Sequence, residues 1–195
     1  MPRVQTSPSD KADAILAAAL ALFVERGYHG TAVPAIAERA GVAAGTIYHH
    51  FANKEELVNA VFRSWKERIA REVHESFPAT AAPREQFRAM WNQLARFALA
   101  HPAAYTFLEY HHHASYLDAN NKSLDAGLKQ FAAVVVGRAQ TLGVVKQLDP
   151  LLLMELVFGA FNGMMRAHFE GRIALDDSRL AAAEAACWDA IARSR

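Results

Sequence analysis

Apolar residues recur every three or four positions along almost the whole chain, which is the period of an amphipathic helix. The pattern predicts a first helix that is capped by Ser7, has Pro8 in its first turn and ends at Gly27. A fourth helix begins after Asn53, with Glu56 as its capping-box partner, and its apolar stripe extends to Phe77.

Two short helices joined by a tight turn are predicted between the first and the fourth. Ala37, Gly41 and Ile47 follow the spacing Ala-x3-Gly-x5-Ile. The small Ala37 lets the two helices approach closely, and Gly41 supplies a left-handed or turn conformation that a side chain would strain. The apolar residues that would bury the angle between the helices are Ile36, Ala40, Val42 and Ile47. This unit is a helix-turn-helix, whose second helix can lie in a DNA major groove.

The rest of the chain also has helical periodicity. A segment with two prolines, residues 78–83, interrupts the pattern and marks a boundary. Further helices are predicted over residues 84–100, 103–117, 121–142, 150–170 and 177–193. No alternating run is long enough for a sheet, so the predicted fold class is all-α.

The helix-turn-helix region resembles the TetR family of transcriptional regulators. The residues that carry the resemblance are Gly27, Thr31, Ile36-Ala37, Ala40-Gly41-Val42, Gly45-Thr46-Ile47-Tyr48-His49-His50-Phe51, Lys54-Glu55 and Leu57. The resemblance implies a three-helix DNA-binding domain at residues 1–53 and a helical effector-binding and dimerisation domain at residues 54–195, with the fourth helix connecting the two. It also implies a homodimeric repressor, without enzymatic activity or a cofactor. Such a repressor binds a palindromic operator in double-stranded DNA and is released by a small, largely apolar ligand.

Carried over to this chain, the resemblance assigns the DNA contacts residue by residue. Residues facing bases or sugar-phosphate edges are Ala44, Gly45, Thr46 and Tyr48, and those facing phosphates are Thr31, His49, His50 and Lys54. The chain departs from the family pattern at two positions. The first is Pro34, which lacks an N–H and leaves phosphate binding at the start of the second helix mainly to Thr31. Ala44 stands where the family often has Lys, Arg or Gln and cannot contact a base edge. Operator shape is therefore expected to contribute more than usual.

Composition changes this picture little. Residues 1–54 hold five Lys or Arg against four Asp or Glu, and the whole chain of 195 residues has a formal net charge of +1. DNA-binding modules are often clearly basic, so this balance counts mildly against DNA binding, although a dimer needs few phosphate contacts. Cys187 is the only cysteine, which excludes an intramolecular disulfide and suits a reducing cytoplasm. No stretch approaches the length of a membrane span, and we expect a soluble cytoplasmic protein that does not bind membranes.

Three consecutive histidines, His111, His112 and His113, raise the alternative of a helical enzyme or metal-binding protein that uses His111 or His113. Consecutive helical residues point about 100° apart, so three of them cannot face one ion. No paired carboxylates, nucleophile elbow, phosphate loop or zinc-ligand spacing supports this alternative, and no metal is expected. A third possibility is a helix-turn-helix used only for protein contacts, which would not need Thr46, Tyr48 and Lys54.

Candidate ligand-pocket and interface residues follow from side-chain type and helical face. Aromatic and methionine side chains suit an apolar pocket, although each one is also typical of plain core. The pocket candidates are Trp65, Phe107, Tyr110, His111, Phe131, Phe158, Phe161 and Met165. Two glycines on one helix face allow close approach of a second subunit or of another helix of the same chain. The interface candidates are Leu152, Leu156, Gly159, Gly163, Leu180, Cys187 and Ile191.

Overall fold

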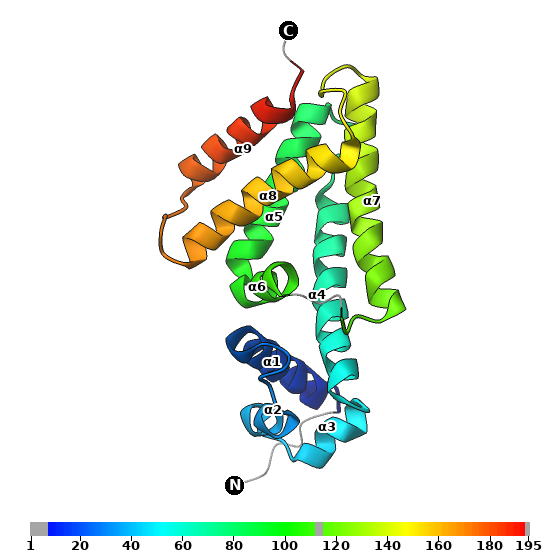
Figure 1. The fold of residues 1–195 in the computed structure, drawn as a ribbon, viewed down its shortest axis with the longest axis vertical. Helices are drawn as coiled ribbons and strands as arrows, with labels where there is room; N and C mark the ends of the chain where they lie inside the picture. The colour runs from blue at the N-terminus through cyan, green and yellow to red at the C-terminus, as the bar shows by residue number, and fades with distance from the viewer. Residues whose placement is uncertain (1–7, 112–114, 194–195) are drawn as a thin grey trace. The chain divides into compact units, whose positions relative to one another are not determined.

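The computed structural model describes residues 8–111 and 115–193, and within these residues the regular structure is helical (Figure 1). The described helices are α1 (Pro8–Arg26), α2 (Val33–Ala40), α3 (Ala44–His50), α4 (Lys54–Ser76), α5 (Pro83–Ala100), α6 (Pro102–Tyr110), α7 (Ala119–Thr141), α8 (Pro150–Phe169) and α9 (Asp177–Ile191). The predicted all-α fold class is confirmed. None of the described helices is long and apolar enough to cross a membrane.

The ends of most predicted helices agree with the structure to within two residues. Gly27, at φ 70°, follows the last residue of α1, as predicted. The predicted cap Ser7 lies outside the described residues. At the start of α4, Asn53 Oδ1 accepts the Glu56 N–H at 2.8 Å, and the Glu56 carboxylate accepts the Ala52 N–H at 2.6 Å. The predicted capping box therefore exists, with its reciprocal bond one residue earlier than expected.

The helix predicted over residues 103–117 is wrong at its C-terminal end. α6 ends at Tyr110, and residues 115–118 form a non-helical connection to α7. Periodicity fails here because the Tyr116 ring is buried and the backbone of the connection bonds to a side chain of α4 instead of to its own helix. His112 and His113 lie outside the described residues, and His111 follows the helix rather than lying within it.

Contacts between residues group the chain into two compact units. Unit 1 contains Met1–Glu67 and Ala103–Lys122, and unit 2 contains Arg68–Pro102 and Ser123–Arg195. Both α4 and α7 therefore begin in unit 1 and continue into unit 2. The predicted boundary after residue 53 separates a DNA-binding domain from an effector-binding and dimerisation domain. This division is by function, and it stays a prediction.

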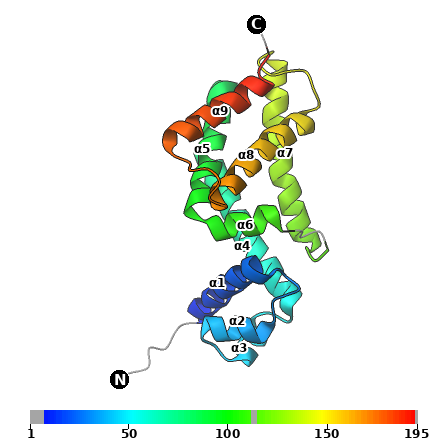
Figure 2. The same cartoon turned by 60° about the vertical axis from the view of Figure 1, so that its left-hand side comes forward.

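Unit 1 consists of α1, α2, α3 and the first part of α4, together with α6 and the connection after it. Figures 1 and 2 show α1, α2 and α3 side by side. Phe23 of α1 and Phe107 of α6 are both fully buried, and their rings stack with centroids 6.1 Å apart. This aromatic contact explains why residues of α6, distant in sequence, belong to the same core as the helix-turn-helix.

Unit 2 packs α5, α8 and α9 together, as Figure 2 shows. Ile191 of α9 and Leu153 of α8 lie in a buried apolar cluster with Ala139 and Val145. The Arg84 guanidinium of α5 forms a two-bond ion pair with Glu184 of α9, whose side chain is only 5% exposed. A buried carboxylate needs such a partner, so this pair specifies which faces of α5 and α9 meet.

Candidate nucleic-acid interface

The turn between α2 and α3 has the geometry that the sequence predicts. Gly41 adopts the left-handed conformation at φ 67°, and the Val42 N–H donates to the Ala37 carbonyl at 3.0 Å, which closes α2. Ile36, Ala37 and Ile47 are buried, so the angle between the two helices is filled as expected. The helix-turn-helix therefore depends on one glycine for its backbone and on three apolar side chains for its packing.

The outer face of α3 is exposed and holds most of the predicted DNA-contacting residues. Tyr48 leaves 55% of its surface in solvent, which is unusual for a large aromatic side chain next to the buried Ile47. The other residues of this helix divide by exposure: Ala44, Gly45 and His49 are exposed, whereas Thr46 and His50 are half-buried. A seven-residue helix that presents an aromatic ring and small residues on one side can approach the floor of a groove closely.

Thr31 has a different environment from the residues of α3. Its side chain is 1% exposed, and its hydroxyl lies 3.0 Å from the Leu22 carbonyl oxygen and 2.7 Å from that of Gly27. The single hydroxyl proton is shared between these two carbonyl oxygens at the C-terminal end of α1. Thr31 therefore joins the end of α1 to the segment before α2, and its hydroxyl is directed at backbone carbonyls rather than at solvent.

Lys54 also makes contacts inside unit 1. Its ammonium donates to the carbonyl oxygens of Tyr28 at 2.9 Å and Thr31 at 3.0 Å, and it lies 4.4 Å from the centroid of the Tyr28 ring. Two of its three N–H groups thus hold the turn between α1 and α2. One N–H is left over for a phosphate, and that contact stays a prediction.

A second cation of the helix-turn-helix is paired within the protein. Arg39 donates to both carboxylate oxygens of Glu25, at 2.5 and 3.1 Å, and this bond holds the pKa of Glu25 below its ordinary value. Both side chains are largely solvated, so the pair contributes little to stability. It does reduce the positive charge that this face can offer to a phosphate backbone.

The predicted pocket residues fall into both units. In unit 1, Phe107 contacts Phe23 and His111, and burial lowers the pKa of His111, which favours its neutral form. Tyr110 packs edge-on against Tyr105, and Trp65 is half-buried. In unit 2, Phe161 and Met165 are fully buried, Phe158 is half-buried and Phe131 lines a groove. Phe131 is the candidate that lines the groove described next.

This groove has a volume of about 440 Å³ and lies between α4 and α7 within unit 2. Its lining is mostly apolar, with polar atoms contributed by one histidine and one serine: Ala70, Val73, His74, Ser123, Leu124, Gly127, Leu128 and Phe131. Of these residues, only Phe131 is a pocket candidate predicted from the sequence. The one signal available was Gly127, a residue that weakens a helix and leaves space beside it.

The predicted interface residues differ in how exposed they are. On α8, Leu152 and Leu156 are 51% and 57% exposed, and Gly159 and Gly163 lie on the same open face. On α9, Leu180 and Cys187 are half-buried, whereas Ile191 belongs to the core cluster of unit 2. Half of the exposed residues of α9 are alanines, which sequence reasoning missed because alanine marks neither core nor surface: Ala181, Ala182, Ala186 and Ala190.

No group of three or more His, Cys, Asp or Glu residues that could hold a metal ion occurs within residues 8–111 and 115–193. His113, one of the two histidines named for the alternative metal or enzyme function, lies outside these residues.

Two family models match consecutive parts of the chain. The model described as bacterial regulatory proteins, tetR family, matches residues 15–61. The model described as tetracyclin repressor-like, C-terminal domain, matches residues 62–193. The first covers the helix-turn-helix and the second covers the helices that follow it.

Individual relatives agree with these matches. The HTH-type transcriptional repressor KstR2 of Mycobacterium tuberculosis is 31% identical over 112 residues, which is 57% of this chain and 51% of the relative. The HTH-type transcriptional activator FasR of Mycolicibacterium smegmatis is 37% identical over 75 residues, 38% of this chain and 34% of the relative. The chain thus matches about half or less of the length of these curated relatives.

A solved structure gives a match along nearly the whole chain. The TetR-family protein from Vibrio parahaemolyticus is 33% identical, with a TM-score of 0.75, and the match covers 93% of this chain and 98% of that one. The similarity therefore extends beyond the helix-turn-helix to both compact units.

The buried hydroxyl of Thr31 generates a prediction about stability. Thr31→Val is expected to lower the free energy of unfolding by about 1–3 kcal/mol, because the hydroxyl donor that two carbonyls share is lost while the side-chain volume is kept. Urea denaturation measures this change. Thr46→Val, at a half-buried position on α3, is the matched control and should be close to neutral. Wild-type stability of Thr31→Val together with a weaker salt dependence of DNA binding would instead assign Thr31 to a phosphate.

Proposed function

Because this chain belongs to the tetR family of bacterial regulatory proteins, we propose that it is a transcriptional regulator that binds operator DNA with α3. The observation that carries the proposal is the 55% exposure of Tyr48 on a short helix that Ile47 anchors from its buried side. The relatives above are transcriptional regulators, and we assign no catalytic role.

The proposed interface combines few charges with close approach. Ala44 and Gly45 have no side chain long enough to reach a base edge, so they let the backbone of α3 lie close to the DNA. Tyr48 and Thr46 supply hydroxyl groups for bases or sugar-phosphate edges, and His49 and His50 supply donors for phosphates. With so few base-reading side chains, sequence-dependent DNA shape carries much of the specificity.

Repression is the form of regulation that we favour. The repressor KstR2 aligns with 57% of this chain, against 38% for the activator FasR. A repressor acts by occupying its operator, which needs no surface for recruiting other proteins. A protein that binds operator DNA must be in the compartment that holds the DNA. The predicted cytoplasmic location therefore follows from the proposed role.

The exposed ring of Tyr48 generates the second prediction. Tyr48→Ala is expected to weaken operator binding about tenfold, equivalent to about 1.4 kcal/mol, with no change in thermal stability because the side chain packs little within the protein. A gel-shift titration with DNA from upstream of the neighbouring gene measures the affinity. Tyr48→Phe separates the contribution of the ring from that of the hydroxyl.

Lys54→Ala is compared with Tyr48→Ala, because it is expected to change the salt dependence of DNA binding. Loss of one phosphate contact should lower the slope of log K against log salt by about one unit, which Tyr48→Ala should not do. Folded variants of both residues that bind DNA like the wild type would contradict the proposed interface.

We propose that a second copy of this chain covers the open face of α8. Leu151, Leu152 and Leu156 leave about half of their surface exposed there, and a Cβ atom built at Gly159 or Gly163 would meet nothing within 4 Å. An apolar face with two glycines suits close packing of two helices across a two-fold axis. A symmetric dimer also supplies the two copies of α3 that a palindromic operator requires.

Gly163→Trp is the third prediction and tests this dimer. The indole has space within its own subunit but would fill the face where the partner helix approaches, so the variant is expected to be monomeric. Analytical ultracentrifugation at micromolar concentration measures the mass. Glu75→Trp, at an exposed position on α4, controls for the effect of adding a surface tryptophan. A wild-type chain that sediments as a monomer would contradict the proposed dimer.

We propose that the groove between α4 and α7 binds the effector. Its volume of about 440 Å³ lies in the range of small-molecule sites, and its apolar walls with a histidine and a serine suit a largely apolar ligand that has one polar end. A ligand releases DNA only if it binds the DNA-free conformation more tightly, and a coupling of about 1–3 kcal/mol is typical.

Gly127→Leu is the fourth prediction and tests this groove. Nothing lies within 4 Å of a Cβ atom at Gly127, so the leucine side chain can occupy the groove without displacing the backbone. We expect it to weaken binding of the apolar dye anilinonaphthalene sulfonate about fivefold or more, measured by fluorescence titration. Gly137→Leu makes the same change on the same helix outside the groove and should bind the dye normally. Equal dye affinity in both variants would exclude the groove as the binding site.

A further inference from the structure

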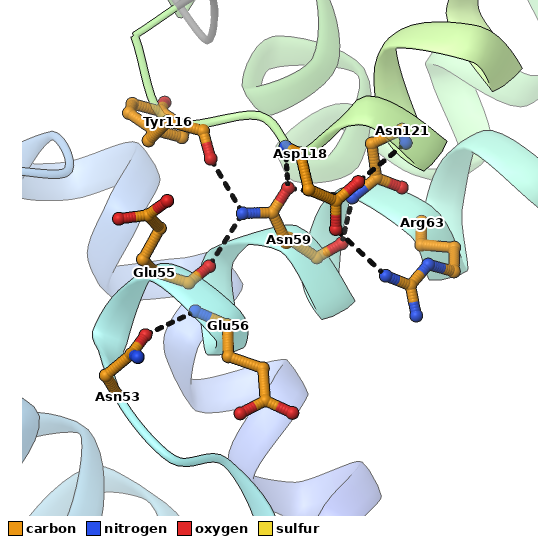
Figure 3. A network of polar contacts seen from close by, with 8 residues as sticks. All are labelled: Asn53, Glu55, Glu56, Asn59, Arg63, Tyr116, Asp118 and Asn121. Carbon is orange, nitrogen blue, oxygen red and sulfur yellow. Dashed lines mark hydrogen bonds and ion pairs between the residues drawn. The ribbon is translucent and has the colours of Figure 1, made fainter.

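A buried asparagine of α4 holds the connection between α6 and α7 by hydrogen bonds (Figure 3). Asn59 is 4% exposed, and its Nδ2 group donates to the Tyr116 carbonyl at 2.7 Å and to the Glu55 carbonyl of its own helix at 2.8 Å. Its Oδ1 atom accepts the Asp118 N–H at 2.9 Å and the Asn121 amide at 2.8 Å. Three of these four bonds reach residues 116–121.

Only an amide side chain of this length fits these four bonds. An aspartate lacks the two donors, a leucine lacks all polar atoms, and a glutamine places its amide one carbon farther out. The Tyr116 carbonyl and the Asp118 N–H lie in a connection outside the helices, and Asn59 is the partner of both groups within unit 1. The position of the connection therefore depends on one side chain of α4.

The partner residue Asn121 lies in the first turn of α7 and is fully buried. Its amide also donates to the Asn59 carbonyl at 3.1 Å, while its own Oδ1 atom has no hydrogen-bond partner among the residues that the structure describes. A buried network with one unsatisfied acceptor is less stable than apolar packing of the same volume. Such a network determines orientation more than it adds stability.

The same connection reaches the start of the helix-turn-helix. The Tyr116 ring is 7% exposed and stacks on the Tyr28 ring, with centroids 4.4 Å apart and planes inclined by 23°. Tyr28 lies in the turn between α1 and α2, the turn whose carbonyls Lys54 binds. Residues 116–121 thus contact α4 through Asn59 and the turn before α2 through Tyr116. We call this set of contacts, made by Asn59, Tyr116, Asp118 and Asn121, the α4–α7 latch.

We propose that Asn59 and Tyr116 are positioning residues for DNA binding: the α4–α7 latch holds the turn before α2 and the first turns of α4 in the arrangement that presents α3 to the operator. The inference rests on the proposed DNA-binding function. Neither residue touches DNA in this account. Ser123 and Leu124 of the groove lie two and three residues after Asn121 in α7, so a ligand in the groove contacts the helix that the latch fixes.

Two variants test the latch. Asn59→Leu removes the amide bonds, and Tyr116→Leu removes the ring stack. Each is expected to weaken operator binding about tenfold or more at a temperature where circular dichroism shows the variant folded, with an unchanged slope of log K against log salt because the phosphate-contacting residues are intact. Arg63→Gln is the matched control. It removes only the exposed 3.3 Å ion pair of Arg63 with Asp118, and its affinity should stay within about twofold of the wild type.

Hydrogen exchange of the wild-type protein tests the same claim without a substitution. If the closed latch favours DNA binding, operator DNA must favour the closed latch by the same factor. The amide hydrogens of Asp118 and Asn121, which bond to side chains of the latch, should then exchange about threefold or more slowly with operator than with scrambled DNA. Unchanged exchange, or wild-type affinity in the folded Asn59→Leu and Tyr116→Leu variants, overturns the latch alone. Failure of the wild type to bind any operator would instead refute the proposed function.

Discussion

Partly or fully buried backbone groups in two turns need hydrogen-bond partners, and the first two turns of α4 provide them. The carbonyls of Tyr28 and Thr31 bond to Lys54, and the backbone of Tyr116 and Asp118 bonds to Asn59. Water does not reach such groups readily, so each of these side chains determines where its turn can lie. The positions of α2 and α3 follow from the first turn, and the start of α7 follows from the second. α4 is therefore the element around which unit 1 is organised.

The electrostatics of unit 1 point to a DNA-binding protein that does not depend on a strong positive field. Arg39 pairs with Glu25, and Lys54 directs two of its donors at backbone carbonyls. Counterion release by few phosphate contacts gives weak binding to random DNA. In the proposed interface, discrimination then comes from the fit of the small, exposed face of α3 and of Tyr48 to the groove, and from DNA shape.

Local signals in the sequence were sufficient to predict the helices, but they were insufficient to predict the roles of several residues. Gly41 and the Asn53–Glu56 capping box act within one turn of helix, so their geometry follows from neighbouring residues. The early end of α6 depends on Asn59, which lies more than fifty residues before the connection that it holds. The burial of Ile191 likewise results from packing with Ala139, Val145 and Leu153, which periodicity along one helix does not record.

The central claim is sequence-specific binding of symmetric DNA by the recognition helix α3. The most direct test is selection of bound sequences from a random DNA library by the purified wild-type protein, followed by sequencing. The account predicts enrichment of a palindrome whose half-sites are centred about one helical turn of DNA, or a multiple of it, apart. Recovery of sequences without two-fold symmetry, or no enrichment over the starting library, would contradict it.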